Sequence, residues 1–163
     1  MRKFNISGSY DFPGHGLDYP VTGIFRVQDD NRVIGILHDH DKNQDIRKAV
    51  LGLHSNGSLN YWKFTPSERG ICPIIWIMQI SDSGIYTGKW GMVTNPTKHF
   101  EDPTQFPELR RVYEAPSEDA ALDVLAEVSL QRIQTLIRPE HIIMISNSDG
   151  GFNGELNLTE VKN

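Results

Sequence analysis

The sequence predicts a mainly β protein. It is either an antiparallel up-and-down barrel or a strongly coiled meander sheet of about eight or nine strands, with one long amphipathic helix packed outside. Three observations support this class. Strand-sized apolar runs follow one another through residues 1–93, separated by short turn-forming segments. The alternation of strand and helix that is typical of a parallel sheet does not occur. A single long helical pattern lies at 117–138.

The length of the chain, 163 residues, fits one domain with a substantial core. We expect this domain to have four parts in sequence order. They are a β-meander at 1–93, a proline-rich loop at 94–116, the helix at 117–138 and final strands at 140–161.

Composition and charge narrow the classes of function. Apolar residues make up 38% of the chain and charged residues 23%, as in ordinary globular proteins. The net charge of −5 argues against a nucleic-acid partner, because phosphate contacts need a clustered positive surface. The single cysteine cannot form an intramolecular disulfide, which favours a reducing, cytoplasmic location. No apolar stretch reaches the roughly 20 residues that span a bilayer and no signal peptide is evident, so we expect no membrane partner.

The predicted strands are runs that alternate with period two or are apolar over a strand length. The strongest turn signal is Asn56-Gly57, between the fourth and fifth runs, because a type I′ turn needs positive φ at both central residues. In order, the runs are "KFNISGSYDF", "VTGIFRVQ", "RVIGILHD", "DIRKAVLGLH", "LNYWKF", "CPIIWIMQIS" and "IYTGKWGMV", with "EHIIMISN" and "GELNLTEV" after the helix.

Two of these strands are apolar on both faces, at 72–80 and 141–145. An antiparallel strand with one face in water should alternate between apolar and polar residues. Both strands are therefore expected to be covered on both sides. The apolar stripe of the helix is one candidate cover, and a subunit interface in a homodimer or other homo-oligomer is the other.

The helix is expected to begin after Ser117, which can cap it, and Glu118 and Asp119 favour the positive end of its dipole. Arg138-Pro139 closes it. Its apolar stripe is formed by Leu122, Leu125, Val128 or Ser129, Ile133 and Leu136.

The predicted strand registers do not decide which face of the strands lies inside the barrel. The Asn56-Gly57 turn places Leu51 opposite Trp62 and Ala49 opposite Phe64, an aromatic-lined face that resembles a packed interior. Ile34, Ile36 and His38 would join this face, which would put His38 at the rim of the barrel. Phe25 opposite Gly35 instead favours the other face of strand 33–39.

Three segments carry a family resemblance: "GSY" (Gly8–Tyr10), the hairpin "VTGIFRVQDDNRVIGIL" with glycines inside its strands, and "YTGKWG" (Tyr86–Gly91). In these segments, within roughly the first 95 residues, the chain resembles the avidin and lipocalin group of meander β-barrels. It departs from lipocalins by having Tyr10 where they usually carry tryptophan, and from avidins by its long helix. The resemblance implies a cup that binds a small molecule, and it transfers no ligand residue.

The aromatic residues on the strands favour a non-catalytic barrel that binds a small apolar or aromatic molecule. Such barrels line a cavity with rings and place a few polar groups at its mouth. His38, His40 and Lys89 are the candidate polar groups. The alternative is that the rings simply fill the core. The predicted ligand-binding residues are Tyr10, Phe25, Trp62, Trp76, Tyr86, Trp90 and His38.

A metal site is a further hypothesis, and it would make the protein a metal-dependent enzyme. If strand 33–39 continues by one residue, His38 and His40 share a face two residues apart, but zinc would need at least one more ligand. The alternative is a solvated strand end, which requires no cofactor. No motif for a serine nucleophile, a zinc protease or a phosphate-binding loop is present.

The proline-broken loop at 94–116 motivates a second function, a protein-interaction or immunity-type module that binds a partner through this loop or an oligomer interface. The alternative is that the loop packs along the barrel through Phe100, Phe106, Leu109 and Val112, because these apolar residues need burial.

Overall fold

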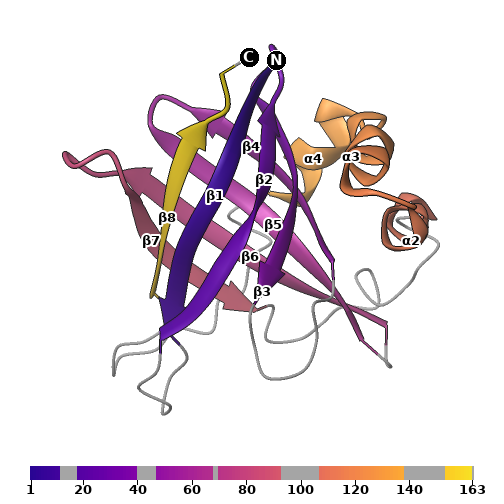
Figure 1. Ribbon diagram of the computed structural model, residues 1–163, viewed down its shortest axis with the longest axis horizontal. Coiled ribbons are helices and arrows are strands. Elements are labelled where there is room, and N and C mark those ends of the chain that lie inside the picture. Colours follow the sequence, from indigo (N-terminus) through magenta and orange to yellow (C-terminus); the bar gives the residue numbers. More distant parts are fainter. Residues whose placement is uncertain (12–17, 40–46, 68–69, 93–106, 138–152, 163) are drawn as a thin grey trace.

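Eight antiparallel strands close into a barrel in the computed structural model (Figure 1). The structure describes residues 1–11, 18–39, 47–67, 70–92, 107–137 and 153–162. Each strand pairs with the next in sequence, and the last pairs with the first. The strands are β1 (Arg2–Asp11), β2 (Asp18–Val27), β3 (Arg32–Asp39), β4 (Lys48–Ser55), β5 (Ser58–Ser67), β6 (Gly70–Ile80), β7 (Tyr86–Met92) and β8 (Asn153–Glu160). The predicted mainly β barrel is confirmed.

The hairpin between β4 and β5 forms at the predicted turn. Asn56 has φ of 52° and Gly57 φ of 78°, which is the left-handed backbone that a type I′ turn requires. Leu51 pairs with Trp62 in the register that this turn sets, as expected. The turn residues therefore fix which side chains face each other across this pair of strands.

Glycines allow large rings to lie directly against the barrel wall. A Cβ atom at Gly35 would stand 2.4 Å from the Phe25 ring, and one at Gly154 would stand 2.2 Å from the Trp76 ring. No side chain fits at such distances. These two positions need glycine because the rings of Phe25 and Trp76 occupy the space where a side chain would begin.

The buried apolar residues form two separate clusters, one on each side of the barrel wall. We call the first the interior cluster; it fills the barrel and includes Phe25, Tyr61 and Trp76. We call the second the outer cluster; it lies between the barrel and the helices. The outer cluster takes from the strands Ile34, Ile36, Ala49, Leu51, Trp62, Phe64 and Ile75, and from the helical segment Leu109, Val112, Ala121, Leu122, Leu125, Val128 and Ile133.

The interpretation of the Leu51 and Trp62 face as the barrel interior was wrong. These residues point outward and are buried under helices, and Val50 and Tyr61 on the opposite face fill the barrel. The alternative suggested by Phe25 opposite Gly35 is the correct one, because Phe25 lies in the interior cluster.

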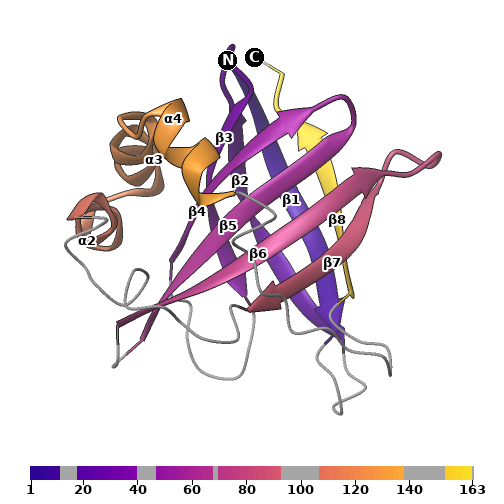
Figure 2. The same ribbon diagram turned by 180° about the vertical axis from the view of Figure 1, so that it is seen from behind.

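The single helix predicted at 117–138 is also wrong, because the structure has two short helices there. They are α3 (Glu118–Ala126) and α4 (Leu130–Leu136), both on one side of the barrel (Figure 2). Ser117 caps α3 as predicted, accepting a hydrogen bond of 3.1 Å from the amide of Ala120. Ser129 caps α4 in the same way. A second capping serine thus begins a new helix where the sequence pattern continues without a break.

An arginine of the barrel accounts for the end of α3. Arg32 Nη1 donates hydrogen bonds to the carbonyl oxygens of Ala126 at 3.1 Å and Val128 at 2.6 Å. Carbonyl groups at a helix C-terminus have no partner within the helix, so a cation there satisfies them. Carbonyl groups at and just after the end of α3 are thus satisfied by a residue that lies 94 positions before Ala126 in the chain.

Part of the proline-rich loop forms a further helix, α2 (Pro107–Glu114). Proline is well suited to the first position of a helix, because its missing N–H has no partner there in any case. Arg47 Nη1 donates to the carbonyl oxygens of Val112 and Ala115 at the other end. Leu109 and Val112 are buried in the outer cluster, as the packing alternative for this segment predicted. Phe100, Phe106, His40 and the strand predicted at 141–145 lie outside the described residues.

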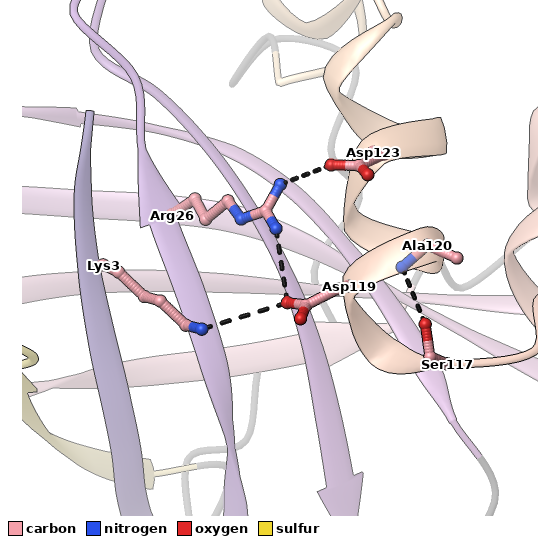
Figure 3. Close-up of polar contacts among 6 residues, drawn as sticks. All are labelled: Lys3, Arg26, Ser117, Asp119, Ala120 and Asp123. Atoms are coloured by element: carbon pink, nitrogen blue, oxygen red, sulfur yellow. Dashed lines mark hydrogen bonds and ion pairs between the residues drawn. The ribbon is translucent and has the colours of Figure 1, made fainter.

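Ion pairs hold α3 against the edge of the helix-covered wall (Figure 3). Arg26 on β2 contacts Asp123 at 2.9 Å and Asp119 at 3.4 Å, and Lys3 on β1 approaches Asp119 at 3.9 Å. The carboxylates are largely exposed, so these pairs orient the helix more than they stabilise it. Of the helices in the described part of the chain, none has the length and apolar character needed to cross a bilayer.

Candidate functional site

Among the residues that the structure describes, three charged side chains lie buried inside the barrel, and we call them the buried charge cluster: Asp39, Lys48 and Lys63. Asp39 is the last residue of β3, Lys48 is the first of β4, and Lys63 lies within β5. Strand alternation places Lys48 and Lys63 on the same face as Val50 and Tyr61, which is the interior. The two lysine side chains, which would ordinarily be expected in water, are therefore enclosed by the barrel.

Both ammonium groups bind the same carboxylate oxygen. Lys63 Nζ lies 2.9 Å and Lys48 Nζ 3.0 Å from Asp39 Oδ2. The side chains are 2%, 7% and 8% exposed for Lys63, Lys48 and Asp39 respectively. Within the cluster, two positive charges therefore face one negative charge in a place largely closed to water.

Aromatic rings surround the ammonium group of Lys63. It lies 5.1 Å from the centroid of Tyr10 and 5.7 Å from that of Trp76, distances at which ring and cation attract each other. Tyr61 stacks on Trp76 with centroids 5.7 Å apart, and Tyr10 stacks on the half-buried Tyr19 at 5.1 Å. The ammonium group of Lys63 thus lies against packed aromatic rings.

Three buried polar atoms in or beside this cluster have no hydrogen-bond partner among the described residues. They are Asp39 Oδ1, Tyr61 Oη and Trp76 Nε1. Tyr61 and Trp76 are 0% and 1% exposed. Most buried polar side-chain atoms in folded proteins are paired, so three unpaired atoms in one neighbourhood require an explanation.

The charges of the cluster shift the pKa of its neighbours in known directions. Burial raises the pKa of Asp39, but the ammonium groups of Lys63 and Lys48 outweigh this effect and hold it below its usual value. Burial, followed by the negative charge of Asp39, raises the pKa of Tyr61 well above its usual value. At neutral pH, Asp39 is therefore ionised and Tyr61 is a neutral hydroxyl that can both donate and accept.

The lowered pKa of Asp39 predicts a pH dependence of stability. The unfolded chain binds the proton of this group more tightly than the folded chain does. The stabilisation is complete above the unfolded pKa of about 3.9 and is lost as the pH falls through the lower, folded value. The free energy of unfolding should thus fall more steeply below about pH 4 in the wild type than in the variant Asp39→Asn/Lys48→Met/Lys63→Met. Urea titrations at several acidic pH values measure this, and parallel curves would contradict it.

A second polar contact lies inside the barrel, near its opposite end. His54 lies near the end of β4, next to the β4–β5 turn. It shares a hydrogen bond of 2.7 Å with the hydroxyl of Tyr86, the first residue of β7. Burial and then the charge of Arg2 lower the pKa of His54, and burial raises that of Tyr86. Both groups are neutral at neutral pH, so this contact bridges β4 and β7 without a buried charge.

The structure gathers most of the predicted ligand residues in the interior cluster, where they contact one another. Tyr10 meets Trp76 and Trp90 edge to face, and Phe25 meets Tyr61 in the same way. Their contact with a ligand stays a prediction. The predicted interior members present there are Tyr10, Phe25, Trp76, Tyr86 and Trp90.

Trp62 and His38 are placed elsewhere. Trp62 is in the outer cluster and stacks on Phe64, so its predicted interior position was wrong. His38 Nε2 lies 2.6 Å from Glu118 Oε1 on α3, which places the histidine on the helix-covered side rather than at a barrel rim. The helices explain both differences, because they give the outward face of these strands an apolar cover of its own.

The metal hypothesis stays a prediction, since His40 lies outside the described residues. Among the side chains that the structure does describe, no three of His, Cys, Asp or Glu come together as a metal site would need. His38 itself is engaged with Glu118.

An open depression of about 560 Å³ lies over β1, β7 and β8. Residue Lys89, a predicted rim group, is part of its lining, and so are Tyr10 and Gly154. The ring of Trp76 covers Gly154 from the barrel interior. The depression and the buried charge cluster are therefore neighbours separated by the barrel wall. The remaining lining residues are Ser9, Asp11, Thr87, Gly88, Asn153 and Glu155.

The buried charge cluster was missed by reasoning from the sequence. Lys48 and Lys63 do share a face with Val50 and Tyr61 at period two, and this was the available signal. Lysines on the same face of two paired strands ordinarily indicate a face exposed to solvent. Their burial is accompanied by the carboxylate of Asp39, which a third strand, β3, brings to both ammonium groups.

Comparison of the chain with protein-family models, with curated proteins and with solved structures finds no match. The meander barrel that the avidin and lipocalin resemblance implied is present, but nothing in the comparisons supports membership of either family.

Proposed function

We propose that the protein binds a small apolar or aromatic molecule at the end of the barrel interior that holds the buried charge cluster. The observation that carries this proposal is the set of three unpartnered buried atoms, Asp39 Oδ1, Tyr61 Oη and Trp76 Nε1. They adjoin two lysines in a ring-lined interior. Ligand sites in barrels combine these same elements, namely aromatic walls and a few convergent polar groups.

A purely structural role accounts poorly for this arrangement. Replacing buried ion pairs by apolar residues of similar volume is often neutral or stabilising, so buried charge is not the simplest means of filling a barrel. Unpaired polar atoms add a further cost of about 1–3 kcal/mol each. A ligand that satisfies them would recover this cost on binding.

The position of the rings favours an aromatic ligand body. Tyr10, Tyr61 and Trp76 already form face-to-face and edge-to-face pairs, and a further ring would extend the same packing. Tyr10 also lines the open depression, whose volume lies in the range of small-molecule sites. The cluster is thus close to a surface hollow that is large enough to admit such a molecule.

The first test compares two tyrosine variants. Tyr61→Phe removes an unpartnered hydroxyl and should leave the free energy of unfolding unchanged or raise it, while weakening binding of benzoate or benzyl alcohol by roughly fivefold. Tyr113→Phe is the matched control, because the Tyr113 hydroxyl donates a 2.8 Å hydrogen bond to the carbonyl oxygen of Phe64 outside the barrel. It should lose about 1 kcal/mol of stability and keep its binding.

Isothermal titration calorimetry with benzoate, benzamide and benzyl alcohol gives the affinities, and urea unfolding gives the stabilities. Native mass spectrometry of the purified protein adds a direct search for a bound small molecule. Absence of binding of all three compounds, together with a native mass equal to the denatured mass, would overturn the proposal. So would binding that Tyr61→Phe leaves unchanged.

A further inference from the structure

The open depression over β1, β7 and β8 is lined, among the described residues, by polar side chains on the outer face of the barrel. β8 lies between the other two strands (Figure 1). Strand alternation turns Glu155 and Asn153 away from Leu156, which lies in the interior cluster, and therefore outward. Their partners on β1 and β7 point the same way. The outward side chains of the lining are Ser9, Asp11, Thr87, Lys89, Asn153 and Glu155.

The strand registers arrange these six side chains in two rows across β7, β8 and β1. Neighbouring strands lie about 4.8 Å apart, and alternate residues along one strand lie about 7 Å apart. One small molecule can therefore reach several of these side chains at once. The first row consists of Thr87, Glu155 and Ser9, and the second of Lys89, Asn153 and Asp11.

One pair in this array is held in place, and two charges in it are available to a ligand. Asp11 accepts hydrogen bonds from the amide of Asn153 at 2.7 Å and from its Nδ2 at 3.2 Å, which fixes the orientation of the Asn153 side chain. Its Oδ1 remains an acceptor. Lys89 and Glu155 are exposed diagonal neighbours of opposite charge, yet they form no ion pair within the described part of the chain.

The lining mixes donors and acceptors and suits a ligand rich in hydroxyl groups. The carboxylates accept hydrogen bonds, the ammonium group of Lys89 donates them, and the hydroxyls of Ser9 and Thr87 do both. Each hydroxyl group of a sugar also donates and accepts, so several on one ring can satisfy this mixture together. In the described lining, two carboxylates stand against one ammonium group, which disfavours an anionic ligand.

We propose that the depression binds an uncharged carbohydrate, with Glu155 and Asn153 Oδ1 accepting hydrogen bonds from its hydroxyl groups and Lys89 donating to them. The volume of about 560 Å³ lies in the range of small-molecule sites. This site is separate from the one proposed in the barrel interior, because the ring of Trp76 covers Gly154 from the inside of the wall.

Binding to immobilised oligosaccharides tests the proposal. The array contains neutral oligosaccharides of glucose, galactose, mannose and N-acetylglucosamine, together with acidic oligosaccharides that carry carboxylate or sulfate groups. The wild type should bind at least one neutral member, and calorimetry with that compound in solution gives the affinity. Glu155→Ala should lower this affinity by roughly tenfold, because the change removes a charged acceptor from the middle of its row.

Asp82→Ala is the matched control, because it also removes an exposed carboxylate but lies in the β6–β7 turn, outside the lining. It should bind as the wild type does, and circular dichroism verifies that both variants are folded. Binding to no neutral member, binding to acidic members alone, an unchanged affinity in Glu155→Ala or an equal loss in Asp82→Ala would each overturn the proposal. None of these results bears on the interior site, which the tyrosine variants test.

Discussion

Replacing Asp39 by asparagine is expected to lower the free energy of unfolding by about 3–5 kcal/mol, because the change removes the carboxylate that both buried ammonium groups contact. Lys63 and Lys48 are 2% and 7% exposed and both contact Asp39 Oδ2, so neither can turn to water without breaking the interior packing. A loss of this size is a large part of the total stability of a domain. Urea unfolding at neutral pH, followed by circular dichroism, measures it.

The control for Asp39→Asn removes the charges together. The variant Asp39→Asn/Lys48→Met/Lys63→Met has no buried charge in the cluster and should recover most of the lost stability, since methionine fills nearly the volume of lysine. Lys48→Met alone, which keeps one balanced pair, should cost much less than Asp39→Asn. If Asp39→Asn lies within about 1 kcal/mol of the wild type, the view of these three residues as one electrostatic unit is wrong.

Trp62→Ala is expected to destabilise the protein by about 3–5 kcal/mol and to loosen the helical layer. Trp62 is 1% exposed and belongs to the outer cluster, where it stacks on Phe64 beneath the helices. Removing its ring leaves a cavity on the outside of the barrel wall. Urea unfolding gives the loss of stability, and hydrogen exchange should show faster exchange of amides in α3 and α4 than in β1.

Ile77→Ala is the matched control for Trp62→Ala, because Ile77 also points outward from the barrel but is 39% exposed. This change should cost about 1 kcal/mol or less. Binding of benzoate by Trp62→Ala protein that is still folded should match the wild type, since the ring lies outside the interior. If both changes lower the free energy of unfolding equally, the burial of Trp62 beneath the helices contributes little to the stability of the protein.

The sequence was sufficient for features that depend on neighbouring residues. Asn56-Gly57 fixed the β4–β5 turn and therefore its register, because few residue pairs adopt positive φ at successive positions. Ser117 fixed the start of α3, because its side chain reaches an amide only three residues ahead. The order of β1 to β7 followed from short connections, which leave consecutive strands little choice of partner.

The tertiary structure alone decided which face of β4 and β5 lies inside. Both faces carry large buried side chains, such as Trp62 outside and Tyr61 inside, so the alternation that usually marks an interior is missing. The covering helices resolve this choice, and carbonyl groups near their ends accept hydrogen bonds from Arg32 of β3 and from Arg47, which precedes β4. A pattern read along one strand contains no information on what covers it.

The candidate site could be predicted from the sequence only in part. Of its members, the aromatic residues Tyr10 and Trp76 were predicted, because rings at alternate strand positions are expected in a barrel interior. The charged members were not, because the burial of Lys63 depends on a carboxylate that lies 24 positions away along the chain and 2.9 Å away in space. Local chemistry thus determined the turns, the first helix cap and the order of the strands. The face that became the interior, and the charges enclosed in it, were decided only when distant strands and helices came together.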